Sequence, residues 1–372
     1  MKIVITGNYG AKNSGDELIL EGLLSAIEEI NPATEVTVLS GDPKETSKRH
    51  RINSDQKFPS GIRSWIKFNF FFEPKTKKHL SECDYFILGG GGLFGGLTIS
   101  ANIIWGVQAL KAFSQKKKVV IYGQSLGNLD GWLNKRIVKH VFSKAHAIAV
   151  RDNQSKEKII RMGICREVFV IPDLALRKKY TPKGIKEEKT LLVSLRELQA
   201  KGETVAKIVA HFINWLKGHE GWKIKIVDFQ GGEKGDIDKK IHEKLVNIVK
   251  DTENIEYLGY IKDSQELLET VEKATIILGM RLHSIIAATM TQTPFMALSY
   301  EPKVDGFLKE SSLSTQGISI ENLTVDKLKL LFKQTERDYE NIKASQKSYC
   351  EKSLEQHRKI EKSTLRKFLQ DD

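Results

Sequence analysis

The feature that most constrains the fold is an alternation of short apolar runs with segments of helical periodicity, which occurs twice along the chain. Such an alternation is typical of parallel α/β sheets with helices on both faces. A polar, basic stretch with turn-forming residues separates the two series. We therefore predict two doubly wound lobes, at 1–176 and 190–326, joined by a linker at 177–189 and followed by a helical tail at 327–372.

The apolar runs give the expected strands. We predict strands in the first lobe at 3–6, 36–39, 85–88, 119–122, 148–150 and 168–171, and in the second at 191–195, 224–227, 256–258, 275–278 and 295–298.

Length and composition fit this organisation. A chain of 372 residues exceeds one ordinary core and suits two domains of roughly 150 to 200 residues. The apolar share of 40% and charged share of 28% are typical of a soluble protein, and no window approaches the roughly 18 apolar residues of a membrane span. A glycine loop follows the start too soon for a signal peptide, so we expect a cytoplasmic protein with reduced Cys83, Cys165 and Cys350.

The net charge of +12 suggests an anionic partner without identifying it. Nucleic acids, anionic membranes and polyanionic ligands all attract basic proteins. A helix with interleaved lysines and glutamates, such as 336–367, is explained by a solvated surface and requires no anionic partner. The segment 61–78 sets aromatic rings beside lysines and arginine. It suits either peripheral contact with the inner membrane surface or a helix buried under a loop.

Candidate site residues of the first lobe follow its strands. The first strand leads through a glycine loop to Asp16 and Glu17, which either cap a helix or supply a carboxylate that orients or deprotonates an acceptor hydroxyl. That loop has neither the Gly-x-Gly-x-x-Gly nor the Walker spacing, which argues against a mononucleotide site. The glycine run 89–92 is entropically costly, so it serves either backbone approach to a ligand or a tight turn. Arg151 follows a later strand.

The second lobe adds an arginine and a histidine at one strand end, Arg281 and His283. Ligands of parallel α/β sheets sit outside the carboxyl ends of strands. Arg281 suits a phosphate or carboxylate, and His283 can exchange a proton near neutrality. The alternative is an ordinary junction with a solvated arginine and a helix-capping histidine. Arg196 and Lys303 follow two other strands of this lobe.

Convergent cations favour a small, highly charged anion. Each opposite pair at about 4 Å is worth on the order of 4 kcal/mol at an effective dielectric constant near 20. Phosphate together with carboxylate fits this requirement. The sequence has no histidine or carboxylate cluster with metal-ligand spacing, so we predict no metal.

An ordered set of short motifs resembles the polysaccharide pyruvyl transferase family. The motifs are Gly-Asn-Tyr-Gly from Gly7, Asn-Ser-Gly-Asp-Glu from Asn13, four glycines with Leu-Phe from Gly89, Gly-Gln-Ser from Gly123, Val-Arg-Asp from Val150, Pro-Asp from Pro172, Ser-Leu-Arg from Ser194 and Met-Arg-Leu-His from Met280. Within the family, the chain most resembles bacterial enzymes that pyruvylate the secondary cell-wall polysaccharide on which surface-layer proteins are anchored.

The resemblance implies a fold and an activity. The expected fold is two Rossmann-like lobes facing a cleft, as in GT-B glycosyltransferases. The sequence of the tail predicts a helix that either packs on the second lobe or crosses back over the cleft. The expected reaction transfers pyruvate from phosphoenolpyruvate, as co-substrate without a cofactor, to a sugar of a lipid-linked precursor. The expected product is a cyclic ketal, 4,6-linked on N-acetylmannosamine, with release of phosphate.

The resemblance also implies residue roles. His283 and Asp16 are the expected catalytic residues. The expected donor contacts are Arg151, Arg281, Arg196, Lys303, Gly90 and Gly91, and the expected acceptor contacts are Asn13, Asn102 and Gln124.

Two other functions compete with this interpretation. A nucleotide-sugar-dependent glycosyltransferase shares the lobes and the basic crevice. A non-catalytic nucleic-acid or membrane binder would explain the charge but not the glycine loops or the Arg281 and His283 pair, so we predict no nucleic-acid partner.

Overall fold

The computed structural model describes residues 1–57, 74–95, 99–218, 221–232, 237–250 and 252–366. The chain forms two compact units. The first unit contains Met1–Ala11, Asp16–Lys178 and Ser353–Asp372, and the second contains Lys12–Gly15 and Lys179–Lys352. The division at 178 and 179 lies inside the linker that the sequence indicates.

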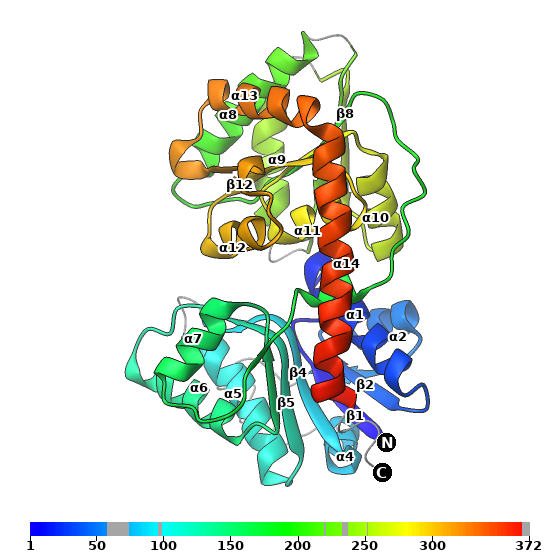
Figure 1. The fold of residues 1–372 in the computed structure, drawn as a ribbon, viewed down its shortest axis with the longest axis vertical. Helices are drawn as coiled ribbons and strands as arrows, with labels where there is room; N and C mark the ends of the chain where they lie inside the picture. The colour runs from blue at the N-terminus through cyan, green and yellow to red at the C-terminus, as the bar shows by residue number, and fades with distance from the viewer. Residues whose placement is uncertain (58–73, 96–98, 219–220, 233–236, 251, 367–372) are drawn as a thin grey trace. The chain divides into compact units, whose positions relative to one another are not determined.

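The first unit is built on a seven-stranded, all-parallel sheet with the order β3-β2-β1-β4-β5-β6-β7 (Figure 1). Its strands are β1 (Lys2–Thr6), β2 (Glu35–Ser40), β3 (Asn53–Gln56), β4 (Tyr85–Phe94), β5 (Lys118–Leu126), β6 (Ala147–Val150) and β7 (Phe169–Val170). Its helices are α1 (Ser14–Ile30), α2 (Pro43–His50), α4 (Pro74–Glu82), α5 (Ile99–Ser114), α6 (Trp132–Lys144), α7 (Asn153–Arg161) and the 3₁₀ turn η1 (Leu174–Arg177).

Alternating side chains bury both faces of this sheet. In β4, Phe86 and Leu88 pack with apolar residues of α5, α6 and α7, whereas Tyr85 and Ile87 pack on the opposite face with α1. Side chains of a strand point alternately to its two faces, so a strand buried on both sides reads as one continuous apolar run. This is why the sequence revealed these strands.

The second unit repeats the plan with a six-stranded parallel sheet of order β10-β9-β8-β11-β12-β13. Its strands are β8 (Thr190–Ser194), β9 (Lys223–Asp228), β10 (Ile255–Tyr260), β11 (Ile276–Gly279), β12 (Phe295–Ser299) and β13 (Gly317–Ser319). Its helices are α8 (Gly202–Lys217), α9 (Ile237–Ile248), α10 (Ser264–Lys273), α11 (Leu282–Met290), α12 (Pro302–Glu310) and α13 (Val325–Arg337), with the 3₁₀ turns η2 (Ser314–Gln316) and η3 (Ile320–Asn322).

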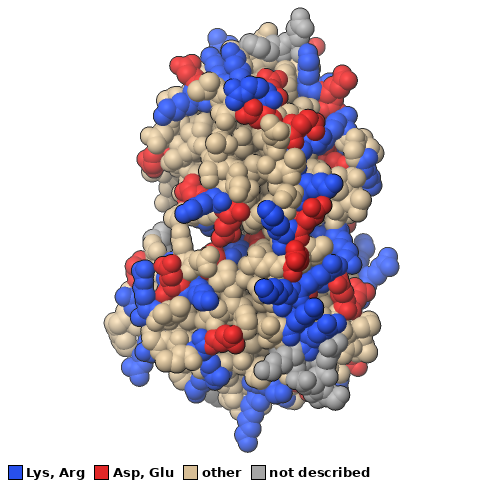
Figure 2. All heavy atoms as spheres, in the orientation of Figure 1, with Lys and Arg blue, Asp and Glu red and all other residues tan. Residues whose placement is uncertain are grey.

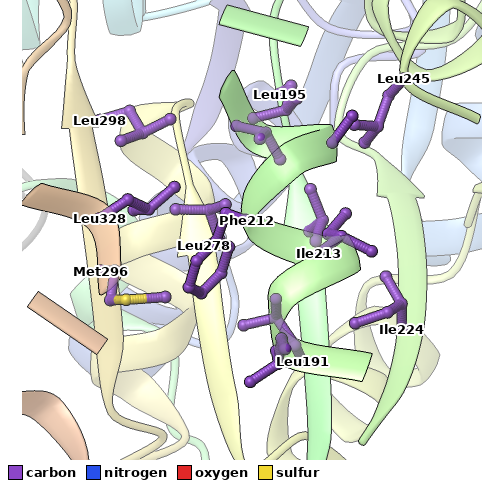
Figure 3. Packing of buried hydrophobic residues seen from close by; sticks show 14 of the residues in the cluster. Leu191, Leu195, Phe212, Ile213, Ile224, Leu245, Leu278, Met296, Leu298 and Leu328 are labelled. Carbon is purple, nitrogen blue, oxygen red and sulfur yellow. The ribbon is translucent and has the colours of Figure 1, made fainter. Parts of the chain in front are cut away.

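The core of the second unit lies between this sheet and helices α8, α9 and α13 (Figure 3). Phe212 and Ile213 of α8 pack among side chains of β8, β9 and β11, and Leu328 of α13 joins them (Figure 3). The buried positions of α8 recur at three- and four-residue spacings, which places one apolar face of the helix on the sheet. Because α13 belongs to this core, the unit extends beyond the predicted boundary at residue 326.

The C-terminal helix α14 (Tyr339–Ser363) is shared by the two units, whose division falls after Lys352. Its last part packs in the first unit, where Arg177 donates to both carboxylate oxygens of Glu361, at 2.8 and 3.2 Å. Of the two predictions for the tail, the part up to Lys352 belongs to the second unit, and the part from Ser353 returns to the first.

All eleven predicted strands occur, but two edge strands were missed. β3 has the polar sequence Asn-Ser-Asp-Gln and β13 spans three residues, so neither gives an apolar run. The structure also corrects the glycine run 89–92 and the end of the strand predicted at 119–122. β4 continues through Gly89–Gly92 to Phe94, and β5 continues to Leu126, with register shifts in the pairing of β4 with β5.

Most of the aromatic and basic segment 61–78 lies outside the described residues; from Pro74 onward it forms α4. Within the described residues, no helix is both long enough and apolar enough to cross a membrane.

Candidate active site

The strand order of each sheet reverses once, between β1 and β4 in the first unit and between β8 and β11 in the second. Ligands of open α/β sheets bind at such a reversal, outside the carboxyl ends of the strands. Asp16 follows β1, and the glycines lie in the last part of β4. Arg196 follows β8, and His283 follows β11. The predicted residues therefore mark the topologically favoured position in each unit.

Close packing explains why two of the β4 positions are glycine. A Cβ atom on Gly89 would lie 2.6 Å from the Tyr9 hydroxyl oxygen. Gly90 has φ +63°, and a Cβ there would lie 1.9 Å from Ile19 Cγ2. These positions fit the tight-packing alternative, so Gly90 needs no ligand to explain it.

The next two glycines face a more open space beside Asp16. Among the described residues, a Cβ on Gly91 would meet Asp16 Oδ1 alone, at 3.1 Å, and a Cβ on Gly92 would meet nothing within 4 Å. Asn8 Nδ2 donates to Asp16 Oδ2 at 2.8 Å and so fixes the carboxylate. Asp16 also lies in the first turn of α1, where a negative charge is favourable. The position of Asp16 suits both predicted roles, that of a helix-capping carboxylate and that of a carboxylate that orients or deprotonates an acceptor hydroxyl.

Glu17, by contrast, is a structural carboxylate. It is buried, accepts from the Gly10 backbone N–H at 2.9 Å, and lies 3.2 Å from both His50 Nε2 and Arg49 Nη1. Burial alone would raise the pKa of Glu17, but the hydrogen bonds from His50 and Gly10 and the charge of Arg49 together lower it. The two adjacent carboxylates therefore have different environments.

Gln124 and Asn102, the predicted acceptor contacts of the first unit, are both fully buried. Gln124 Nε2 donates to the carbonyl oxygens of Leu88 and Gly90, at 3.3 and 2.9 Å, and its Oε1 accepts from the Leu93 N–H. Asn102 Oδ1 accepts from the Gly95 N–H at 2.8 Å. Gln124 therefore braces the glycine segment, and its predicted acceptor contact stays a prediction.

Arg151 is held by a carboxylate that the sequence did not pair with it. Arg151 Nη1 donates to Asp173 Oδ2 at 2.8 Å, and Asp173 Oδ1 accepts from the Ala175 N–H at 3.0 Å. The imidazole of His357, from α14, lies 3.3 Å from the Asp173 carbonyl oxygen. Burial lowers the pKa of His357 to about 4. Arg151 is therefore part of an ion pair and not an unmatched cation.

A lysine that sequence reasoning missed lies close enough to Asp16 to feel its charge. Lys57 follows β3, and its Nζ lies 3.3 Å from a Cβ placed on Gly41. Burial lowers the pKa of Lys57, while the charge of Asp16 partly opposes this. Only the missed polar edge strand could have indicated its position.

In the second unit, Arg281 is also matched by a buried aspartate. Its Nε lies 2.9 Å from Asp238 Oδ1, and its Nη2 contacts the same carboxylate. Asp238 also accepts from the N–H groups of Phe229 and Gln230, both at 3.0 Å. The Arg281 side chain is only 11% exposed and occupies the N-cap position of α11 without a side-chain capping bond. Neither a solvated arginine nor a capping histidine describes this junction.

His283, the second residue of α11, lies against the segment 12–15, which belongs to the same unit. A Cβ on Gly15 would lie 2.2 Å from His283 Nδ1, so only glycine fits beside the imidazole. Asn13 forms an isolated β-bridge with Gln230, and its Oδ1 accepts from the Gly15 N–H at 3.0 Å. Asn13 thus shapes the turn that contacts His283. The sequence-based division placed this segment in the first lobe, 1–176, whereas the structure places it in the second unit.

Arg196 has a neutral partner. Its Nη1 donates to the Tyr300 hydroxyl at 2.6 Å, and the guanidinium lies 5.2 Å from the centre of that ring. Burial and then the charge of Glu301 raise the pKa of Tyr300, although both Arg196 and Arg281 oppose this. Lys303, the other predicted cation, lies 2.8 Å from a Glu301 carboxylate oxygen. Tyr300 follows β12 and was not among the predicted residues.

A buried histidine and a buried aspartate support the start of the loop that follows β8. His242 Nδ1 lies 2.6 Å from Asp228 Oδ1, and His242 Nε2 accepts from the Leu195 N–H at 2.8 Å. Because both ring nitrogens are engaged, the pair serves to fix the backbone next to Arg196. Within the described part of the chain, no group of three or more His, Cys, Asp or Glu side chains is arranged to hold a metal ion.

The structure therefore groups the predicted residues by unit. The first unit contains Asp16, Gly90, Gly91, Asn102, Gln124 and Arg151, and the second contains Asn13, Arg196, Arg281, His283 and Lys303.

Comparison with solved structures supports the predicted fold. HepE from Anabaena, solved with UDP, superimposes with a TM-score of 0.62 at 14% identity, covering 96% of this chain and 95% of that one. A glycosyltransferase from Rickettsia africae gives a TM-score of 0.60 at 12% identity, covering 100% and 99% of the two chains. MnaA from S. aureus, solved with UDP, gives 0.60 at 14% identity over 93% and 90%. At such identities the likeness concerns the fold, which is GT-B-like as predicted.

Comparison of sequences identifies the family. The amylovoran biosynthesis protein AmsJ from Erwinia amylovora is 22% identical over 373 aligned positions, which cover 87% of this chain and 89% of AmsJ. The family profile described as polysaccharide pyruvyl transferase matches residues 13–302. That range includes every predicted catalytic and donor-binding residue except Lys303. The chain is therefore an enzyme of the polysaccharide pyruvyl transferase family.

Proposed function

We propose that the enzyme transfers pyruvate from phosphoenolpyruvate to a sugar of a lipid-linked cell-wall polysaccharide precursor. The product is a cyclic ketal, 4,6-linked on N-acetylmannosamine in the secondary polysaccharide that anchors surface-layer proteins. Phosphoenolpyruvate is a co-substrate, and the reaction uses no cofactor. The observation that carries this proposal is the group of Arg196, Arg281 and His283 at the switch point of the second unit.

Donor binding is assigned to this group. Arg281 forms an ion pair with Asp238, whereas Arg196 donates a hydrogen bond to the neutral hydroxyl of Tyr300. An anion near the Arg281 pair is attracted by the guanidinium and repelled by the carboxylate, so much of the Coulomb energy cancels. Arg196 therefore supplies the stronger net attraction for the phosphate or carboxylate of the donor. Arg281 and Lys303 provide directed N–H groups more than net charge.

Proton transfer is assigned to His283. As imidazolium it protonates the methylene carbon of phosphoenolpyruvate, which makes C2 electrophilic. Ser284 Oγ donates to the Arg281 carbonyl oxygen at 2.6 Å, and Gly15 contacts the imidazole ring. These contacts hold the start of α11 and limit the space beside the ring. A fixed ring is what a general acid needs to reach one carbon atom.

Hydroxyl activation is assigned to Asp16. Asn8 holds Oδ2 and directs Oδ1 toward Gly91, beside the open space at Gly92. A sugar hydroxyl placed there would give its proton to Oδ1 as its oxygen adds to C2. The bare backbone of the two glycines leaves room for a sugar ring next to the carboxylate.

Two bonds to C2 form and the bond from C2 to the phosphate oxygen breaks. The first hydroxyl oxygen adds to C2, phosphate leaves, and the second hydroxyl oxygen closes the ketal. Each hydroxyl releases one proton: the first returns to His283 through the base and solvent, and the second leaves with phosphate. No oxidant, reductant or metal is required.

The direct test supplies the enzyme with phosphoenolpyruvate and a lipid-linked disaccharide ending in N-acetylmannosamine. We expect phosphate release that depends on the acceptor, and a product whose ketal methyl group is detected by NMR. A parallel reaction with UDP-sugars tests the alternative, a nucleotide-sugar-dependent glycosyltransferase. Release of UDP with no phosphate from phosphoenolpyruvate would refute the proposal. A glucosamine-terminated acceptor serves as the control for sugar specificity.

A further inference from the structure

The outer surface of the first unit carries exposed apolar side chains on three consecutive helices. Among the described residues, seven large hydrophobic side chains are exposed, and four of these lie on α5, α6 and α7. They are Leu110 at 43%, Trp132 at 72%, Leu133 at 37% and Ile160 at 58%. Leu110 and Ile160 lie in the last turns of α5 and α7, whereas Trp132 and Leu133 together begin α6. Isolated exposed apolar residues are common, so the adjacent pair Trp132 and Leu133 is what indicates an interaction surface.

The helix α6 gives this surface its charge. Its 13 residues include four lysines and arginines and no aspartate or glutamate. Lys135, Arg136 and Lys139 are exposed, while Val138, Val141 and Phe142 are buried against the sheet. α6 therefore turns its apolar side inward and a cationic side outward, and it begins with Trp132 and Leu133 in solvent.

The neighbouring helix α7 adds little net positive charge, because exposed Arg161 pairs with Glu157 at 3.2 Å. Arg166 Nε donates to the Ser143 carbonyl oxygen at the end of α6. Lys139 Nζ lies 3.6 Å from a Cβ placed on Gly163, just after α7. Figure 2 shows scattered side chains of both signs over this part of the first unit.

We propose that the start of α6 docks on an anionic lipid surface. Tryptophan favours the depth of the lipid headgroups, where its ring is apolar and its N–H meets polar groups. Lys135, Arg136 and Lys139 lie within the next seven residues, where they would meet lipid phosphates. Protein interfaces are depleted in lysine, which makes a protein partner the poorer match.

The helix α13 offers a matched surface that differs from α6 in two features. It also carries an exposed leucine, Leu330 at 67%, and four lysines and arginines. However, it includes two acidic residues, Asp326 and Glu336, and no tryptophan. If exposure and cations alone were sufficient, α13 would bind lipid as well as α6 does.

The experiment is sedimentation of the full chain with phosphatidylcholine vesicles, with or without phosphatidylglycerol. We expect binding to the anionic vesicles only, decreasing as salt screens the charges. Each cation near an anionic surface is worth about fivefold in partitioning, so Lys135→Ala with Arg136→Ala should weaken binding about thirtyfold. Trp132→Ser with Leu133→Ser should also weaken it, while Leu330→Ser should not.

Several results would overturn the inference. They are absence of vesicle binding, equal binding to neutral vesicles, equal loss in Leu330→Ser, binding to single-stranded RNA in place of vesicles, and a Trp132-dependent dimer without vesicle binding. The assay contains no substrate, so its outcome is independent of pyruvyl transfer. Thermal unfolding of each variant shows whether a loss of binding reflects loss of fold.

Discussion

The switch points of the two sheets have opposite chemical character. In the first unit, the strand ends present a carboxylate, Asp16, beside backbone without side chains. In the second unit, they present Arg196, Arg281 and His283. The topology is similar, with one strand-order reversal in each sheet. The two units therefore have similar topology but different side chains at the switch point, a carboxylate in the first and arginine and histidine in the second.

The two units also share one device. Each holds a strand-end arginine against a buried aspartate, Arg151 with Asp173 and Arg281 with Asp238. Removing one member of such a pair leaves an uncompensated buried charge and costs about 3–5 kcal/mol of stability. Arginines selected from sequence as ligand contacts can thus be essential to the fold. Measuring both donor binding and stability in each variant distinguishes a ligand contact from a structural ion pair.

The largest expected effect concerns His283. Replacing His283 with alanine removes the general acid, so kcat for phosphate release should fall by about 10² to 10⁴-fold. His211→Ala is the matched control, because His211 is an exposed helical histidine of the same unit. Near-native kcat in folded His283→Ala would exclude the assigned role.

The next effect tests the carboxylate of the first unit. Asp16→Asn keeps an oxygen for the hydrogen bond from Asn8 but cannot accept a proton, so kcat should fall by about 10²-fold. Glu28→Gln, an exposed carboxylate change on the same helix, should leave kcat unchanged. Equal kcat in the Asp16→Asn and Glu28→Gln enzymes would limit Asp16 to stabilising the start of α1.

A smaller effect distinguishes Arg196 from Arg281. Loss of a hydrogen bond to a charged group predicts a roughly ten- to hundredfold increase of the phosphoenolpyruvate KM in Arg196→Ala. Arg281→Ala should instead lower the free energy of unfolding by about 3 kcal/mol, because Asp238 remains buried. Steady-state kinetics and urea unfolding measure the two quantities. A stable Arg281→Ala enzyme would show that the ion pair is not structural.

The smallest effect is the pH dependence of stability that Glu17 confers. Its pKa is lower in the folded protein than in the unfolded chain, so its contribution is present above the unfolded pKa and lost as the pH falls through the folded pKa. Urea unfolding between neutral and acidic pH should therefore give a flatter curve for Glu17→Gln than for the wild type. Parallel curves would mean that His50 and Arg49 do not stabilise the ionised form.

Sequence reasoning located the strands and the switch-point residues because buried parallel strands and the polar residues after them leave a local pattern. It did not find the ion pairs, since Asp173 lies 22 residues from Arg151 and Asp238 lies 43 residues from Arg281. It also placed Gly89–Gly92 in a loop, because a positive φ within a bulged strand has no distinct sequence signal. Lys57 and Tyr300 were missed because their role depends on neighbours from other strands.

The most direct test of the contrast between the two units is calorimetric titration of phosphoenolpyruvate into two variants. If the second unit binds the donor, Arg196→Ala should bind it ten- to hundredfold more weakly than the wild type, by roughly the worth of one charged hydrogen bond. Asp16→Asn should bind it with unchanged affinity. Unchanged affinity in Arg196→Ala with weakened affinity in Asp16→Asn would contradict the assignment of donor and acceptor chemistry.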